Sequence, residues 1–246
     1  MTSPLDVAIL GAGVSGLCMG IQLKRAGITS FAIFEKSQDV GGTWLDNSYP
    51  GSGCDVPSHL YSFSFEPNPE WSRAFSPQPE IQRYLRHCAE KYRVLEQIRF
   101  GTEITGARFD EHAGVWRIRT RAGEEITAKA LVSGLGQLNR PHVPDLPGLA
   151  NFAGTRFHSA RWNHQHDLAG ERVAVIGNGA SALQFIPEIA KTAQRVTVFQ
   201  RSANWVIPRN DREFSEADAR SARRHRGVRR EAPAGFLEAQ EVTRWP

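Results

Sequence analysis

The stretch DVAILGAGVSGLCMG, residues 6–20, combines a short apolar run with a turn that carries glycine at three spaced positions. The apolar run predicts a buried strand, and the sequence after the turn predicts a helix. Gly11 permits the tight turn, Gly13 leaves room for a pyrophosphate, and Gly16 lets the helix pack close to the strand. The stretch therefore predicts the first turn of a dinucleotide-binding unit, in which the helix N-terminus faces the phosphates.

An acidic residue follows at the place where such a unit needs one. Residues 31–35, FAIFE, predict a second strand that ends at Glu35. A carboxylate at this distance from the glycines accepts hydrogen bonds from both ribose hydroxyls of a dinucleotide. A structural turn followed by a surface glutamate is the alternative, and the order of strand, turn, helix and strand favours the binding site.

A second unit of the same kind begins late in the chain. RVAVIG predicts a strand, GNGASA a phosphate-binding turn that supplies Gly177, Gly179 and Ser181, and RVTVFQ the next strand. That strand ends in Gln200 and Arg201 instead of an acid, and a guanidinium binds a 2′-phosphate through charge-assisted hydrogen bonds. We expect NADP(H) at this unit, with a solvated surface arginine as the alternative. The first unit is then expected to hold FAD, because a flavin needs a nicotinamide to reduce it.

The sequence between the two units predicts further structure. Residues 37–69 lack periodicity and are rich in aromatics, residues 78–92 predict a helix, and short strands are expected at 104–109, 115–120 and 124–133. The predicted fold class is α/β: a Rossmann-like FAD-binding domain with a small antiparallel β insertion, followed by the start of a second Rossmann-like NADP-binding domain. We predict an FAD-binding domain at residues 1–150 and a linker at residues 151–170. Residues 171–246 are predicted to form a partial NADP-binding domain with a basic helical tail.

Composition sets limits on the class of protein. Hydrophobic residues make up 40% and charged residues 23% of the 246 residues, which is typical of a globular chain. No apolar run approaches the ~18–20 residues of a membrane span. Asp6 precedes the first glycine turn where a secretory signal would need an apolar core, so we expect a cytoplasmic protein. The three cysteines lack the spacing of a zinc site or of a disulfide scaffold, so no metal is expected.

Basic residues crowd one late segment of the chain. Seven of the eleven residues at 220–230 are arginine or histidine, within a formal net charge of +4. Such a cluster is compatible with nucleic-acid binding, but it lacks interleaved aromatics and any known nucleic-acid module. A solvated basic helix is the favoured interpretation, and we expect no nucleic-acid partner.

Three stretches together resemble the Baeyer–Villiger monooxygenases, the class B flavoprotein monooxygenases. They are GGTWLDNSYPGSGCDVPSHLYSFSF (41–65), FAGTRFHSARWN (152–163) and VFQRSANWVIPR (198–209), and the similarity runs from residue 5 to about residue 210. The second stretch supplies the family signature in order, with a departure at Asn163, where the family has Pro or Asp. The signature residues are Phe152, Gly154, His158 and Trp162. The related N- and S-oxidising flavin monooxygenases carry tyrosine at the tryptophan place, so Trp162 favours the Baeyer–Villiger side.

The resemblance implies cofactors, a reaction and a set of site residues. NADPH reduces the flavin, O₂ gives a flavin C4a-peroxide, and one oxygen atom enters a ketone to give an ester or lactone; amine or sulfide oxidation is the alternative. The ADP half of FAD is expected at Gly11, Gly13, Gly16 and Glu35, and NADPH at Gly177, Gly179, Ser181, Gln200 and Arg201. The isoalloxazine end and the nicotinamide are expected at Gly42, Thr43, Trp44, Asp55 and Tyr61.

The resemblance gives Asp55 a catalytic role, because its counterpart pairs with an arginine that faces the peroxide. The sequence offers no candidate for that arginine. His158 is expected to couple the two domains, with direct proton transfer as the alternative. Family members continue well beyond this length, so a nucleotide-binding fragment without activity of its own is a further alternative. On this interpretation residues 152–163 form a hinge between a flavin unit and a nicotinamide unit.

Overall fold

The computed structural model describes residues 3–224. The described residues divide into two compact units, and the first comprises residues 3–53 and 77–207. Both glycine-rich turns lie in this first unit. The second unit comprises residues 54–76 and 208–224.

A mixed sheet with the strand order β3-β2-β1-β6-β5-β4 forms the centre of the first unit. Its parallel part contains β1 (Leu5–Leu10), β2 (Phe31–Phe34), β3 (Ile98–Arg99) and the C-terminal half of β6 (Glu125–Ser133). These strands are short and apolar, as expected for strands covered on both faces. Adjacent parallel strands need crossover connections, and the helix after β1 provides the first one.

The antiparallel part of the sheet consists of β4 (Ile104–Asp110), β5 (Val115–Thr120) and the N-terminal half of β6. Gly123, at φ +87°, turns the chain between β5 and β6. The predicted antiparallel insertion is confirmed, and it is continuous with the parallel sheet. Strand β6 joins the two parts because Ala128 pairs with Trp116 on one side and with Leu5 on the other.

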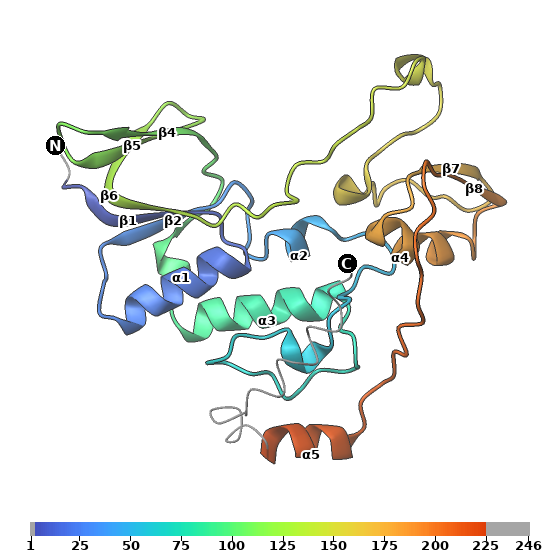
Figure 1. Cartoon of the computed structure of the whole chain (residues 1–246), viewed down its shortest axis with the longest axis horizontal. Coiled ribbons are helices and arrows are strands. Elements are labelled where there is room, and N and C mark those ends of the chain that lie inside the picture. The colour runs from blue at the N-terminus through green and yellow to red at the C-terminus, as the bar shows by residue number, and fades with distance from the viewer. Residues whose placement is uncertain (1–2, 225–246) are drawn as a thin grey trace. The chain divides into compact units, whose positions relative to one another are not determined.

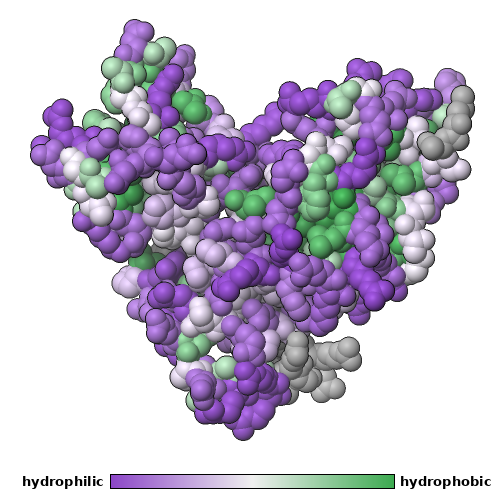
Figure 2. All heavy atoms as spheres, turned by 180° about the vertical axis from the view of Figure 1, so that it is seen from behind, coloured by the Kyte–Doolittle hydropathy of each residue, from purple (hydrophilic) through white to green (hydrophobic). Residues whose placement is uncertain are grey.

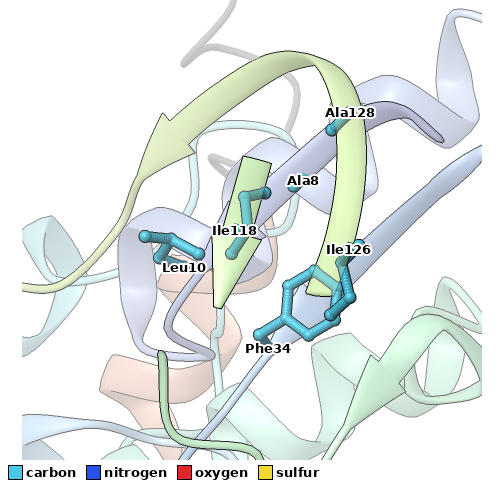
Figure 3. Packing of buried hydrophobic residues seen from close by; sticks show 6 residues of the cluster. All are labelled: Ala8, Leu10, Phe34, Ile118, Ile126 and Ala128. Atoms are coloured by element: carbon cyan, nitrogen blue, oxygen red, sulfur yellow. The ribbon is translucent and has the colours of Figure 1, made fainter. Parts of the chain in front are cut away.

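On one side of the sheet, side chains of the parallel strands β1 and β2 pack against side chains of β5 and β6, as Figure 3 shows. The buried residues of this cluster are Ala8, Leu10, Phe34, Ile118, Ile126 and Ala128. Along β1 and β2 the side chains alternate between the two faces, which is the period of two of a strand. Burial of this cluster therefore fixes the register between the parallel and antiparallel strands.

The opposite face carries helices α1 (Val14–Arg25) and α3 (Gln78–Lys91), which lie side by side in Figure 1. Ile9 and Ile33 are fully buried on this side. A Cβ at Gly20 would lie 2.8 Å from the Ile33 side chain, so the glycine lets α1 approach the sheet. Helix α3 begins with Pro79 in its first turn, as predicted, and ends one residue before the predicted end.

The second glycine turn belongs to a smaller parallel pair, β7 (Arg172–Ile176) and β8 (Arg195–Phe199), connected by α4 (Ala180–Ile189). The face toward α4 is apolar and buries Val175, Phe185 and Ile189. On the other face Ile176 pairs with Phe199, and each side chain is 56% exposed. The predicted second βαβ unit is confirmed, together with the α/β fold class.

The remaining elements are short. Helix α2 spans Thr43–Asp46, and 3-10 helices occupy Ser58–Leu60, Leu95–Gln97, Leu149–Asn151 and Ser159–Arg161. In the second unit α5 spans Glu216–Arg224, and its Arg223 forms two hydrogen bonds with Glu70 at 2.7 and 2.9 Å. Arg220 likewise contacts Glu216, so these two arginines of the basic cluster bind carboxylates. Arg224 ends α5 and is exposed, and residues 225–230 of the cluster lie outside the described residues.

The visible surface in Figure 2 is largely hydrophilic, with hydrophobic side chains gathered in separate patches. Large apolar side chains that are exposed include Leu138, Trp205, Val206 and Ile207. In the stretch from residue 3 to residue 224, no helix combines the length and apolar character needed to span a membrane.

Candidate cofactor sites

The first glycine turn is fixed by backbone contacts that exclude side chains. Gly11 has φ +97°, its N–H donates to the Phe34 carbonyl at 2.8 Å, and an added Cβ would lie 2.7 Å from the Gly134 carbonyl oxygen. At Gly16 the contact is tighter, because an added Cβ would lie 1.8 Å from the Gly11 carbonyl oxygen. Both positions therefore require glycine for steric reasons, as the sequence predicts.

The helix that follows this turn presents an open N-terminus. Gly13 is the N-cap of α1, no side chain caps the helix, and its first turn contains no acidic residue. The free N–H groups and the positive end of the helix dipole favour an anion here. The turn therefore has the shape and the polarity that a pyrophosphate requires.

Glu35 lies directly beside the first turn and is only 6% exposed. One carboxylate oxygen accepts a hydrogen bond from the Ala12 N–H at 2.7 Å, and the other accepts one from the Ser37 N–H at 2.8 Å. Each oxygen has a second lone pair, so the carboxylate retains acceptor capacity for hydroxyl groups. Its position matches that of a ribose-binding acid, and it also ties the turn to the end of β2.

The segment Gly41–Trp44 meets the same turn. Gly41 donates its N–H to the Ala12 carbonyl at 3.1 Å, and an added Cβ on Gly42 would lie 3.0 Å from the Gly13 Cα. Gly41 and Gly42 both have positive φ, which glycine adopts without strain. Thr43 is exposed at the start of α2, whereas Trp44 is 9% exposed and its carbonyl accepts a hydrogen bond from Gln78. The structure thus brings Gly42 close to Gly11, Gly13 and Glu35.

The second glycine turn repeats the geometry with fewer steric restrictions. Gly177 has φ +104° and donates its N–H to the Phe199 carbonyl at 2.8 Å, and Gly179 is the N-cap of α4. A Cβ added to Gly177 or Gly179 would have no described atom within 4 Å, so the turn is open. Helix α4 has no side-chain cap and no acid in its first turn, where Ser181 lies half-buried. The free N–H groups and the positive end of the helix dipole favour an anion at this N-terminus as well.

Gln200 and Arg201 follow β8 and are both exposed. The Asn178 side chain, in the middle of the turn, donates to the Gln200 side-chain oxygen and to the Ser202 carbonyl, each at 2.8 Å. Asn178 therefore holds the segment that carries Arg201 against the phosphate turn. This role of Asn178 is not among the predictions from the sequence, although a polar residue between two glycines is a signal for it.

The linker signature is divided between local and longer contacts. The Phe152 ring, 59% exposed, lies over Gly154, and the His158 ring nitrogen Nδ1 accepts a hydrogen bond from the Ala160 N–H at 3.1 Å. Trp162 packs against Phe185 of α4, with ring centroids 5.4 Å apart. Trp162 thus contacts the helix that follows the second glycine turn, whereas these contacts of Phe152 and His158 lie within their own segment. The coupling of two domains by His158 stays a prediction.

The surroundings of His158 disfavour its charged form. Burial lowers the pKa of His158 below its ordinary value, and the nearby Arg161 and His142 lower it further. The ring already accepts a hydrogen bond through Nδ1, which suits a neutral imidazole. This arrangement agrees with a structural role for the residue.

Asp55 and Tyr61 belong to the second compact unit. An oxygen of Asp55 lies 3.9 Å from a guanidinium nitrogen of Arg209, which also lies 3.5 Å from Asp211 and stacks over the Phe75 ring. Tyr61 ends the 3-10 helix at Ser58–Leu60 and donates its N–H to the Ser58 carbonyl. Arg209 could not be predicted as the partner of Asp55, because no spacing in the sequence connects residue 55 with residue 209.

The three cysteines are free thiols, and burial raises the pKa of Cys54, next to Asp55. A buried thiol of this kind is a packing residue and a poor nucleophile. Among residues 3–224 no cluster of His, Cys, Asp or Glu has the composition of a metal site.

The sequence of the chain is similar to those of known flavin-binding monooxygenases. A family model described as flavin-binding monooxygenase-like matches residues 5–226. A Baeyer–Villiger monooxygenase of Pseudomonas aeruginosa is 51% identical over 218 residues, which are 89% of this chain and 41% of that protein. A Baeyer–Villiger monooxygenase of Streptomyces coelicolor is 51% identical over 212 residues, 86% of this chain and 41% of that protein.

The fold also matches that of solved structures. A crystal structure of OTEMO in complex with FAD and NADP has a TM-score of 0.87 and 36% sequence identity, covering 92% of this chain and 44% of that one. The chain therefore spans about two fifths of the length of the curated relatives described above.

Proposed function

The chain belongs to the flavin-binding monooxygenase-like family, and we propose that it binds FAD and NADPH as part of a Baeyer–Villiger monooxygenase. One observation carries the proposal: each of the two βαβ units has a helix N-terminus without a side-chain cap after its glycine turn. The residues that follow the next strand differ between the two βαβ units. The first has buried Glu35, and the second has exposed Gln200 and Arg201. A flavin and the nicotinamide that reduces it require such a pair of unlike sites.

FAD is assigned to the first turn. Gly11, Gly13 and Gly16 leave the pyrophosphate in contact with backbone N–H groups, and Glu35 offers its remaining lone pairs to ribose hydroxyls. The isoalloxazine end is assigned to Gly42, Thr43 and Trp44. The contact of Gly42 with Gly13 supports this assignment, because it places the segment Gly41–Trp44 against the first glycine turn.

NADPH is assigned to Gly177, Gly179, Ser181, Gln200 and Arg201. Arg201 is exposed at the end of β8, where its guanidinium is free to meet a 2′-phosphate, and an acid at that place would repel the phosphate. The bond from Asn178 to Gln200 supports the assignment, because it holds the segment that includes Arg201. The sequence segments 1–150, 151–170 and 171–246 are proposed as the FAD-binding domain, the linker and the partial NADP-binding domain.

When bound, the nicotinamide supplies a hydride and the flavin uses it to activate O₂ for insertion into a substrate. Asp55 is proposed to act together with Arg209, whose guanidinium lies 3.9 Å away and supplies the opposite charge. Tyr61 and the buried Trp44 are proposed to exclude water with their rings. His158 is proposed to orient the linker, since its ring caps a turn of that segment.

A ketone is proposed as the substrate, with an ester or lactone as product. The names of the two relatives that are 51% identical support a ketone over an amine or sulfide. Trp162 supports the same choice, because the N- and S-oxidising relatives carry tyrosine there.

Flavin binding and reduction test the proposal in order. The purified chain is incubated with FAD, freed of excess by gel filtration and examined for flavin absorbance; about one flavin per chain is expected. Addition of NADPH without oxygen is then expected to bleach the flavin. A colourless chain refutes the FAD assignment, and a flavin that NADPH does not bleach refutes the assignment of the second site.

Product analysis with oxygen separates the remaining alternatives. The chain is supplied with NADPH and with a ketone, an amine or a sulfide, and the products are identified by mass. A lactone or ester supports the Baeyer–Villiger assignment, whereas an N-oxide or sulfoxide alone supports heteroatom oxidation. Flavin and NADPH binding without product would identify these residues as the cofactor-binding part of a longer enzyme.

A further inference from the structure

Gln184 lies on α4, five residues after the N-cap Gly179, and its side-chain amide is used on both sides. The amide oxygen accepts hydrogen bonds from the Tyr49 hydroxyl at 2.9 Å and from the Gly53 N–H at 3.3 Å. The amide nitrogen donates to the Gly53 carbonyl at 2.9 Å. All three hydrogen bonds run to the loop at residues 47–53, which follows α2.

The same loop packs tightly on the helix. Tyr49 is 7% exposed, and its ring meets Phe185 edge-on with centroids 5.9 Å apart. Gly51 has φ +77°, and an added Cβ would lie 2.6 Å from the Gln184 carbonyl oxygen. The loop backbone therefore rests directly on the α4 backbone, at a distance that only glycine allows.

Two contacts with the linker strengthen this junction. The Ser48 hydroxyl lies 2.8 Å from the His164 ring, and an oxygen of Asp46 lies 3.5 Å from Arg161. Residues 46–53 are thus bound both to α4 and to the segment that contains the family signature. The loop begins where α2 ends, and α2 begins at the Gly42 contact with the first phosphate turn.

We propose that Gln184 is a positioning residue that couples occupancy of the second phosphate turn to the loop 47–53 and, through it, to the flavin end of the first site. This inference rests on the proposed function. Helix α4 is a rigid element, and Gln184 is ~7.5 Å along its axis from the N-cap. An anion that fixes the N-terminus therefore also fixes the position of the Gln184 amide. The loop follows because its Tyr49 hydroxyl and Gly53 backbone are bound to that amide.

The test uses hydrogen exchange in the presence and absence of NADP⁺, which does not depend on turnover. In the unchanged chain, NADP⁺ is expected to slow amide exchange in a peptide that covers residues 47–54 by about tenfold. Gln184→Met keeps the length and apolar volume of the side chain but removes the three hydrogen bonds to Tyr49 and Gly53. It is expected to bind NADP⁺ with a Kd within about threefold of the unchanged value, while the slowing of exchange disappears.

Two further variants serve as comparisons. Tyr49→Phe removes one of the three hydrogen bonds and keeps the ring packing, so it is expected to lose part of the NADP⁺-dependent slowing. It also keeps the proposal testable if Gln184→Met does not fold. Gln22→Met changes an exposed glutamine on α1 and is expected to behave like the unchanged chain. In the FAD-bound chain, Gln184→Met is expected to slow flavin reduction by saturating NADPH by about tenfold.

Each outcome has a definite meaning. If Gln184→Met retains the NADP⁺-dependent slowing of exchange and the rate of flavin reduction, the coupling role is refuted while the proposed function stands. A lower melting temperature with unchanged coupling would assign Gln184 a structural role and equally refute the proposal. If the unchanged chain does not bind NADP⁺, the NADPH assignment itself fails, and the coupling inference fails with it.

Discussion

The contact at Gly16 leads to a prediction that the structure makes quantitative. Gly16 lies in the first turn of α1, and a Cβ added there would lie 1.8 Å from the Gly11 carbonyl oxygen and 3.0 Å from its carbonyl carbon. The neighbour is backbone, so no side-chain rotation can relieve the contact. In Gly16→Ala the start of α1 must therefore move away from the turn by more than an ångström.

The energetic consequence is the balance of two effects. Overpacking costs ~1–3 kcal/mol or more, and a backbone contact as short as this one belongs at the upper end. Alanine also gains ~1 kcal/mol over glycine in a helix. The expected net loss is therefore about 2 kcal/mol, which corresponds to a fall in Tm of ~4–8 °C for a chain of this size.

Thermal unfolding followed by circular dichroism measures this loss, with flavin retention as a second readout. Gly106→Ala is the matched control, because Gly106 lies in β4 and an added Cβ has no described atom within 4 Å. The control is expected to unfold within ~1 °C of the unchanged chain, whereas Gly16→Ala should also retain less FAD. A Gly16→Ala chain with the Tm and flavin content of the control would refute the steric argument.

Three further predictions concern charge. Arg201→Ala is expected to raise the Kd for NADPH by about tenfold or more and to leave that for NADH nearly unchanged, as measured by titration; equal losses for both would contradict the 2′-phosphate assignment. Glu35→Gln leaves one oxygen to serve two backbone donors, so FAD retention in gel filtration should fall by about tenfold, and unchanged retention would remove Glu35 from the site. The folded-state pKa of His158 is lowered, so protonation of this residue destabilises the folded chain. The loss of stability begins as the pH falls below the ordinary pKa of ~6.5 and is complete below the folded-state pKa. The Tm of His158→Asn should therefore fall less than that of the unchanged chain between pH 7 and pH 5, and parallel curves would show that His158 contributes nothing to this pH dependence.

Much of the fold was predictable because its signals are local. A strand, a glycine turn and a helix follow one another within residues 5–25, and hydrophobic period and glycine placement identify each of them. The helix at Gln78–Lys91 was predictable from its apolar face and from Pro79 in the first turn. The continuity of the antiparallel strands with the parallel sheet was not, because it depends on Ala128 pairing with Leu5 more than one hundred residues earlier.

The candidate sites divide in the same way. The glycines and Glu35 could be proposed from spacing, since a carboxylate at the end of the second strand necessarily lies near the first turn. Arg209 beside Asp55 and Gln184 beside Tyr49 could not, because each pair joins segments more than one hundred residues apart. Gln184 in particular reads as an ordinary polar position on an apolar helix until the loop that covers it is known.

The sequence by itself determined two units of strand, glycine turn and helix whose next strands are followed by residues of opposite charge, Glu35 and Arg201, because steric demands at glycine and charge at strand ends act over a few residues. Only the tertiary structure decided how those turns are connected. The junction of the loop 47–53 with α4 requires a buried tyrosine, a glycine at positive φ and a glutamine to meet. Each of these residues is common on its own, and the free energy of their contact arises only when the folded chain removes them together from water.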